Sequence, residues 1–87
     1  MTDTVQCWLV ERSFGDRNLV TVVYATEDGA LYRQQERSEH AVRRSPVEAG
    51  AEFPADELEE TPDAETRERY AKEAQRTAAS YEPDEEI

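Results

Sequence analysis

Histidine and cysteine, the side chains best suited to bind metals or to attack substrates, each occur once in the 87-residue chain, as His40 and Cys7. A structural zinc site needs about four such ligands, and a catalytic nucleophile needs a neighbouring base. Cys7 lies in an apolar run, which is typical of a small buried residue, and has no partner for an internal disulfide. The sequence therefore predicts no enzyme activity, metal or cofactor.

Carboxylates are the other side chains that could hold a ligand, and one short segment is rich in them: Asp56, Glu57, Glu59, Glu60 and Asp63. The segment lacks the spaced Asp/Asn and Gly pattern of a calcium-binding loop. We interpret it as a solvated acidic surface. The three glycines of the chain are too far apart for a phosphate-binding loop, so no small-molecule ligand is predicted.

Arginines could contact phosphates, and four of them follow Tyr32 closely in the sequence: Arg33, Arg37, Arg43 and Arg44. Arginines beside an aromatic ring are typical of nucleic-acid-binding surfaces. Against this, an acidic protein repels polyanions and high salt weakens phosphate contacts. The same arginines could instead pair with surface carboxylates. Nucleic-acid binding through these four residues is the alternative functional hypothesis.

The chain has 21 acidic and 10 basic residues, which gives a net charge of −11, and Lys72 is its single lysine. Repulsion on this scale opposes a compact state in dilute buffer. At about 1 M salt the Debye length falls to roughly 3 Å and the repulsion is screened. The acidic excess is largest in residues 54–87, so we expect binding to involve the less acidic first half.

Four segments with alternating or apolar patterns predict β-strands, at residues 5–12, 19–26, 30–37 and 47–53. Asp28-Gly29 between the second and third predicts a tight hairpin turn. Residues 38–45 are interpreted as a loop or a short strand extension. Residues 54–60 are interpreted as one helical turn or a loop that carries Leu58 inward.

The C-terminal third predicts one helix over residues 62–80, because Thr61, Pro62 and Asp63 form a typical helix start. Residues 82–87 are predicted to be a disordered acidic tail. The expected fold is a single α+β domain over residues 1–81. It consists of an antiparallel meander of three or four strands with the C-terminal helix packed on one face.

One helix can cover only one face of this sheet, and we place Trp8 and Val10 with Tyr24 on the covered face. The other face then carries Cys7, Leu9, Val23 and Tyr32 and would expose a large apolar patch. Residues 38–60 could wrap over it, a second copy of the chain could pair through it, or another protein could bind there. The leading hypothesis is therefore a non-enzymatic protein-interaction module that uses these four residues. Its partner could be another protein or a second copy of the chain.

The N-terminal residues lack a charged and then apolar leader, and no apolar run reaches the roughly 18 residues of a membrane span. We expect a soluble cytoplasmic protein. The segments CWLVERSFGDRNLVTVVYAT, FPADELEE and ETRERYAKEA resemble the short, uncharacterised acidic proteins of halophilic archaea. That resemblance implies a salt-rich cytoplasm and a small α+β fold, and it implies no catalytic or binding residue. An acidic protein from a GC-rich genome is the other interpretation of this composition.

Overall fold

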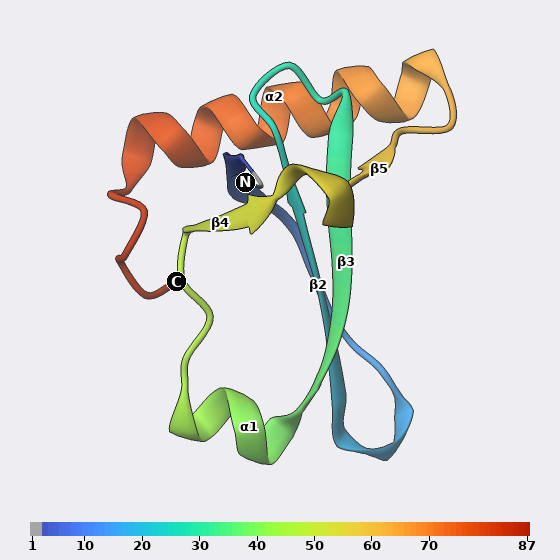
Figure 1. The fold of residues 1–87 in the computed structure, drawn as a ribbon. Helices are drawn as coiled ribbons and strands as arrows, with labels where there is room; N and C mark the ends of the chain where they lie inside the picture. Colours follow the sequence, from blue (N-terminus) through green and yellow to red (C-terminus); the bar gives the residue numbers. More distant parts are fainter. Residues whose placement is uncertain (1–2) are drawn as a thin grey trace.

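A computed structural model describes residues 3–87 and shows one antiparallel sheet crossed by a long C-terminal helix (Figure 1). The strands β1 (Thr4–Phe14), β2 (Leu19–Ala25) and β3 (Leu31–Ser38) form the predicted meander. At the two edges, β4 (Gly50–Pro54) pairs with β1, and β5 (Glu59–Glu60) pairs with β3. The α+β class is confirmed, but the described residues form five strands instead of three or four.

The turn between β2 and β3 has the geometry that Asp28-Gly29 predicts. Gly29 has a φ of 71°, a conformation that residues with a Cβ rarely adopt. The Asp28 carboxylate accepts hydrogen bonds from the Thr26 hydroxyl (2.6 Å) and from the Ala30 amide (3.0 Å). These hydrogen bonds fix the turn where it contacts the C-terminal helix.

A β-bulge in β1 decides which side chains share a face of the sheet. Phe14 lies opposite Val20, and Leu9 lies opposite Tyr24. Leu9 is five residues from Phe14, whereas Tyr24 is only four residues from Val20, so β1 has one extra residue in this interval. Without it, Val10 would lie opposite Tyr24. Because a shift of one residue exchanges the two faces of a strand, our placement of Trp8 and Val10 on the face of Tyr24 is wrong.

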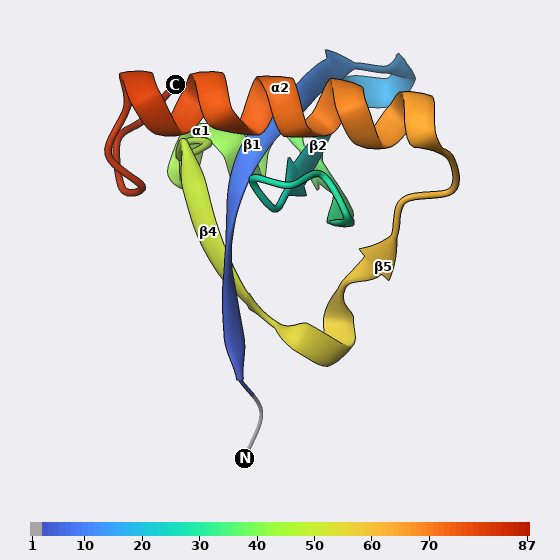
Figure 2. The ribbon, with the colours of Figure 1, turned by 90° about the horizontal axis from the view of Figure 1, so that it is seen from above.

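The sheet has a hydrophobic core on each face. The larger core consists of Cys7, Leu9, Val20, Val22, Tyr24, Val47 and Phe53. The smaller one, beneath α2 (Ala64–Ser80), consists of Val23, Ala25 and Tyr70, with Val10 and Tyr32 packed against it. Figure 2 shows α2 running across the strands.

Residues 42–58, which we call the strap, cover the larger core. Val42, Ala51 and Leu58 pack against it, and the Phe53 ring lies 5.7 Å from the Tyr24 ring. The inward position of Leu58 is confirmed, and the single 3-10 turn before it spans Ala55–Glu57. The strap joins the two edges of the sheet because it includes β4 and leads directly into β5.

Residues 38–45 begin as a one-residue extension of β3, which ends at Ser38, but the rest is not the loop or strand that we had expected. They contain the helix α1 (Glu39–Arg44), whose first turn is capped by the Ser38 side chain accepting from the Ala41 amide. A six-residue helix shows too little of the 3.6-residue period to be recognised from its sequence.

The C-terminal helix begins slightly later than predicted. Asp63 is its N-cap and accepts a hydrogen bond from the Thr66 amide at 2.7 Å. Thr61, the predicted cap, instead donates to the Gly29 carbonyl (2.8 Å) and thereby joins the helix entry to the β2–β3 turn. Near the other end of α2, the buried Thr77 hydroxyl donates to the carbonyl of Leu9 beside the bulge (2.8 Å).

Residues 82–87, predicted to be a disordered tail, lie along residues 47–50. The amides of Ala49 and Gly50 donate to the carbonyls of Glu85 (2.7 Å) and Pro83 (2.8 Å), and the Ile87 amide donates to Val47 (2.9 Å). The tail is therefore held by backbone hydrogen bonds against the segment that leads into β4. Its acidic composition gave no sign of this pairing, because the pairing uses backbone groups.

Candidate interaction surface

The four residues of the predicted interaction face do not share a surface. Cys7 and Leu9 belong to the core beneath the strap. Val23 belongs to the core beneath α2, and Tyr32 packs against that core. Cys7 and Val23 are 0% and 1% exposed. The β1 bulge separates the residues we had grouped, and the strap covers the face of Cys7 and Leu9, as the first of our three alternatives held.

Two of the four arginines proposed to contact nucleic acid have partners within the fold. The Arg33 guanidinium lies 2.9 Å from a Glu57 carboxylate oxygen and 5.3 Å from the centroid of the Phe53 ring, so it attaches β3 to the strap. Arg37 donates to the Ser45 carbonyl at the end of α1 (2.5 Å). Both side chains follow the alternation of β3 onto the strap-covered face.

The other two arginines, Arg43 and Arg44, are exposed on α1. The Arg43 side chain is 74% exposed and pairs with Glu39 one turn earlier. An exposed pair of this kind contributes little to stability. These two arginines are therefore available to a partner, whereas Arg33 and Arg37 are not.

Arg43 and Arg44 belong to one end of the molecule, which we call the distal end and define as residues 12–19 and 36–45. It comprises the β1–β2 turn and α1, and it lies far from α2 (Figure 1). These segments contain five arginines and three acidic residues, in a chain whose acidic residues outnumber its basic ones by 21 to 10. The distal end thus has the opposite sign of charge from the rest of the protein.

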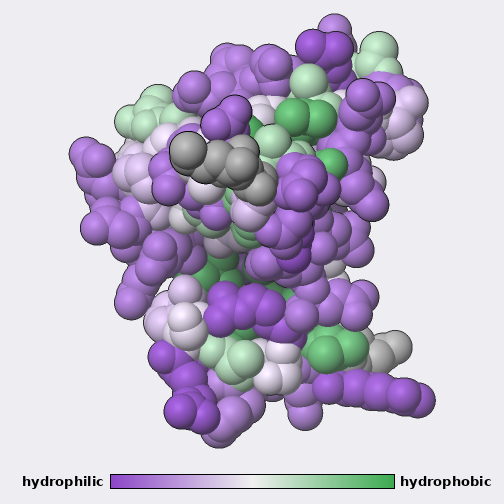
Figure 3. All heavy atoms as spheres, in the orientation of Figure 1, coloured by the Kyte–Doolittle hydropathy of each residue, from purple (hydrophilic) through white to green (hydrophobic). Residues whose placement is uncertain are grey.

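The distal end also exposes large apolar side chains. Phe14 is 76% exposed and Leu19 is 39% exposed. Figure 3 shows a surface that is mostly hydrophilic, with apolar atoms beside the β1–β2 turn at its lower right. Apolar and arginine side chains are thus close together at this end.

The β1–β2 turn itself is strained. Arg17 and Asn18 have φ values of 61° and 60°, in the left-handed region that glycine occupies at no steric cost. Two consecutive residues with side chains in this region are unfavourable. Strain of this kind concentrates at functional sites, although it does not by itself identify a ligand.

The outer edge of β1 has no neighbouring strand near the distal end. β4 pairs with β1 only as far as Trp8, whereas β1 continues to Phe14. The Gly15 amide donates to the Leu19 carbonyl, so by alternation the backbone of Ser13 faces β2. The N–H and C=O groups of Arg12 and Phe14 therefore point outward, away from β2.

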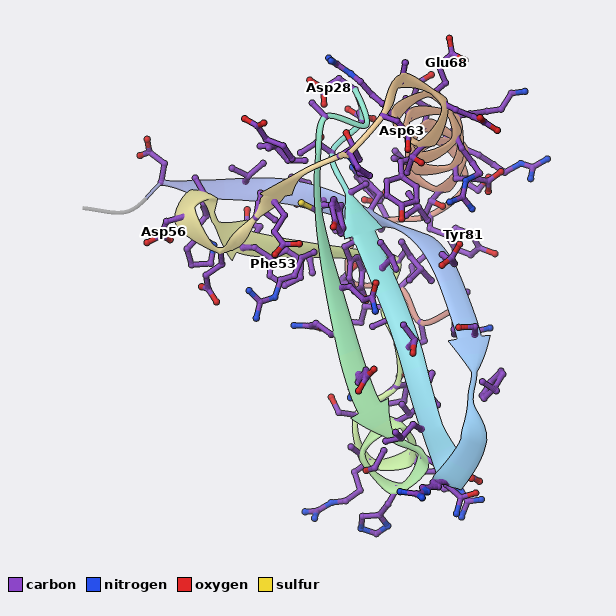
Figure 4. All side chains as sticks on the ribbon, turned by 90° about the vertical axis from the view of Figure 1, so that its right-hand side faces the viewer. Asp28, Phe53, Asp56, Asp63, Glu68 and Tyr81 are labelled. Atoms are coloured by element: carbon purple, nitrogen blue, oxygen red, sulfur yellow. The ribbon has the colours of Figure 1, made fainter. Side chains whose placement is uncertain are left out.

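A shallow groove adjoins this edge and is lined by Val10, Tyr81 and Ile87 among others. Tyr81 is 39% and Ile87 37% exposed, and Tyr81 lies beside β1 in Figure 4. The Arg12 guanidinium donates to the Ile87 carbonyl at 2.8 Å, which holds the end of the tail against the strand. The large apolar side chains described as exposed in residues 3–87 thus all lie along β1 or its hairpin turn.

Our sequence analysis did not identify these exposed residues. Phe14 lies next to Gly15 and Asp16 in a polar segment, and an apolar residue just before a turn was the available signal. Tyr81 and Ile87 carried no such signal, because their position beside β1 depends on the course of the C-terminal tail.

The model of a protein family of unknown function, DUF7967, matches residues 1–87. The chain belongs to the DUF7967 family. No curated protein and no solved structure matches it. Membership of DUF7967 assigns no role to any residue.

The thiol and the carboxylates of this DUF7967 chain are not arranged as a reactive or metal-binding site within residues 3–87. Burial raises the pKa of the Cys7 thiol to about 11, so the reactive thiolate is scarcely populated near neutral pH. Within residues 3–87, no three His, Cys, Asp or Glu side chains are grouped so as to hold a metal ion. The described helices are too short or too polar to cross a membrane. Surface contact is the property that the geometry supports best.

Proposed function

We propose that this protein is a small non-enzymatic interaction module whose contact surface is the distal end together with the outer edge of β1. The observation that carries this proposal is the 76% exposure of Phe14. Aromatic and arginine side chains are enriched at protein interfaces and dominate their binding energy. Phe14 lies between Arg12 and Arg17 in the sequence, whereas the chain as a whole has 21 acidic and 10 basic residues.

A photo-crosslinking amino acid tests this proposal directly. A benzoylphenylalanine replacing Phe14 keeps an aromatic ring at an exposed position, and the same residue replacing Glu68 on α2 is the matched control. We expect position 14 to cross-link to protein in living cells and position 68 not to do so. Equal cross-linking at both positions, or none at either, would contradict the proposal.

The alternative partner is nucleic acid, and the observation in its favour is that Arg43 and Arg44 are exposed, with Arg43 beside the Arg17 turn. In a salt series, binding through these arginines should weaken steeply as salt rises. Arg43→Glu with Arg44→Glu should abolish that binding, whereas Arg67→Glu on α2 should not. Absent binding, or binding that these substitutions leave unchanged, removes this alternative.

We further propose that the protein works in a salt-rich cytoplasm. The net charge of −11 and the single lysine support this. Lowering salt from about 1 M to the millimolar range should lower the melting temperature, because screening of the carboxylates is lost. A melting temperature that does not change with salt would contradict this proposal.

A further inference from the structure

We propose that the open edge of β1 pairs with the same edge of a second copy of the chain, forming a two-fold antiparallel dimer across Arg12, Ser13 and Phe14. This proposal rests on the interaction function above and names its partner. It starts from the outward-pointing backbone groups of Arg12 and Phe14, which the described structure leaves without a neighbouring strand. An unpaired strand edge is a ready template for another strand.

Two-fold symmetry restricts the pairing to a few registers. Residues directly opposite each other must present the same face of the sheet, so a two-fold axis has to pass between a residue and its own copy. An axis at Ser13 places Arg12 of each copy opposite Phe14 of the other. Their outward backbone groups then exchange hydrogen bonds in two symmetric pairs.

Charge favours the register centred on Ser13. An axis at Arg12 would place two arginines directly opposite each other, which is destabilising. An axis at Phe14 would leave the outward groups of Arg12 without a strand partner. The Ser13 register instead places a guanidinium beside an exposed aromatic ring on the same face, an arrangement that is attractive.

The same register covers the other exposed apolar side chains. It brings the partner's β1–β2 turn alongside Val10, because β1 pairs antiparallel with its copy. The groove lined by Val10, Tyr81 and Ile87 would then lie against the partner's β1–β2 turn. One contact would thus reduce the exposure of Phe14, Tyr81 and Ile87.

The acidity of the chain also indicates this edge as the place where two copies meet. A contact through the strap or the C-terminal tail would bring carboxylates together, because each has more acidic than basic residues, whereas α2 has four basic and three acidic residues. The distal end, with five arginines and three acidic residues, avoids that repulsion. Charge therefore disfavours the strap and the tail, and the unpaired backbone groups distinguish this edge from α2.

A disulfide at Ser13 tests both the partner and the register. Ser13 and its copy would form a non-hydrogen-bonded pair with Cα atoms about 4.5 Å apart, within the range of a disulfide. We expect Ser13→Cys to form a covalent dimer under mild oxidation at about 1 M salt. Ser80→Cys, at an exposed position on α2, is the matched control. The native Cys7 is buried and should not cross-link in the wild-type protein.

We expect Ser13→Cys to cross-link at least about tenfold faster than Ser80→Cys, and faster than Arg12→Cys or Phe14→Cys. In the unmodified chain, sedimentation equilibrium should show a dimer that Phe14→Ala weakens about tenfold. A monomer at all concentrations, or equal cross-linking rates for Ser13→Cys and Ser80→Cys, would overturn the proposal. If position 14 still photo-cross-linked to a different protein, the interaction function would stand and only the second copy would be excluded.

Discussion

The end of the sheet beneath α2 and the distal end differ in how well their strands are covered, although the same three strands run through both. Near α2, the strands lie between the helix and the strap, and their side chains are buried on both faces. At the distal end, β1 loses its outer neighbour, the turn is strained, and Phe14 is exposed. The contrast shows that one end contains most of the buried core, while the other has an unpaired strand edge and an exposed aromatic side chain.

The two hairpin turns show the same contrast in the backbone. Gly29 has a positive φ at no steric cost and is buried against α2, and Asp28 and Thr26 fix its turn. Arg17 and Asn18 have similar φ values with side chains attached. Substitutions that compare the two ends can therefore separate folding from function.

The two phenylalanines of the chain provide the largest expected difference. Phe53 is 9% exposed and packs on Tyr24, whereas Phe14 is 76% exposed. Phe53→Ala should lower the free energy of unfolding by about 3–5 kcal/mol, because it leaves a cavity. Phe14→Ala should change it by no more than about 0.5 kcal/mol. Urea unfolding of the monomer checks both values, and equal losses would remove the distinction between the two ends.

Two glycines provide the next comparison. A Cβ on Gly29 would lie 2.1 Å from the Arg67 carbonyl oxygen, and the φ of 71° adds strain. Gly29→Ala should therefore cost about 2–3 kcal/mol of unfolding free energy. Gly15→Ala at the distal turn should cost far less, because its Cβ would meet only the Leu19 carbonyl oxygen, at 3.8 Å. Similar melting temperatures for the two variants would show that the β2–β3 turn is not packed against α2 as described.

The strain at the distal turn should be removable. Arg17→Gly removes the Cβ that makes the left-handed backbone conformation unfavourable at this position. We expect it to raise the free energy of unfolding by about 0.5–1 kcal/mol. Arg12→Gly, in a regular part of β1, should instead lower it. A loss of stability in Arg17→Gly would mean that the Arg17 side chain makes contacts that outweigh the strain.

The smallest effect depends on pH at the turn near α2. The hydrogen bond from Thr26, followed by that from the Ala30 amide, lowers the pKa of Asp28. Because the pKa is lower in the folded state, the charged carboxylate stabilises the protein above about pH 4, and this contribution is lost as the pH falls further. Asp28→Asn should therefore lower the urea midpoint at pH 7 and have little effect at pH 3. A midpoint difference that is the same at both pH values would contradict this account.

The sequence was sufficient to predict the meander, the Asp28-Gly29 turn and the C-terminal helix. Each depends on local patterns: alternation along β2, turn residues with the required backbone freedom, and strong helix formers after a cap. The inward position of Leu58 was also predictable from the sequence. These features lie mainly at the end of the molecule that contains most of the buried core.

The face assignment failed at one residue. In an unbroken hairpin, Trp8 and Val10 would lie on the same face of the sheet as Tyr24. The β1 bulge moves them to the opposite face. The bulge is held by tertiary contacts, including the hydrogen bond from Thr77, 68 residues away in sequence. The candidate interaction surface was unpredictable for a related reason, because it depends on where β4 and the C-terminal tail leave β1 unpaired.

Amide hydrogen exchange at three consecutive residues of β1 tests the central claim most directly. The amides of Arg12 and Phe14 point outward, whereas the Ser13 amide faces β2. At about 1 M salt, raising the protein concentration should slow exchange at Arg12 and Phe14 and leave Ser13 and Gly29 unchanged. Exchange at Arg12 and Phe14 that stays fast at every concentration would show that this edge of the distal end does not pair with a second copy.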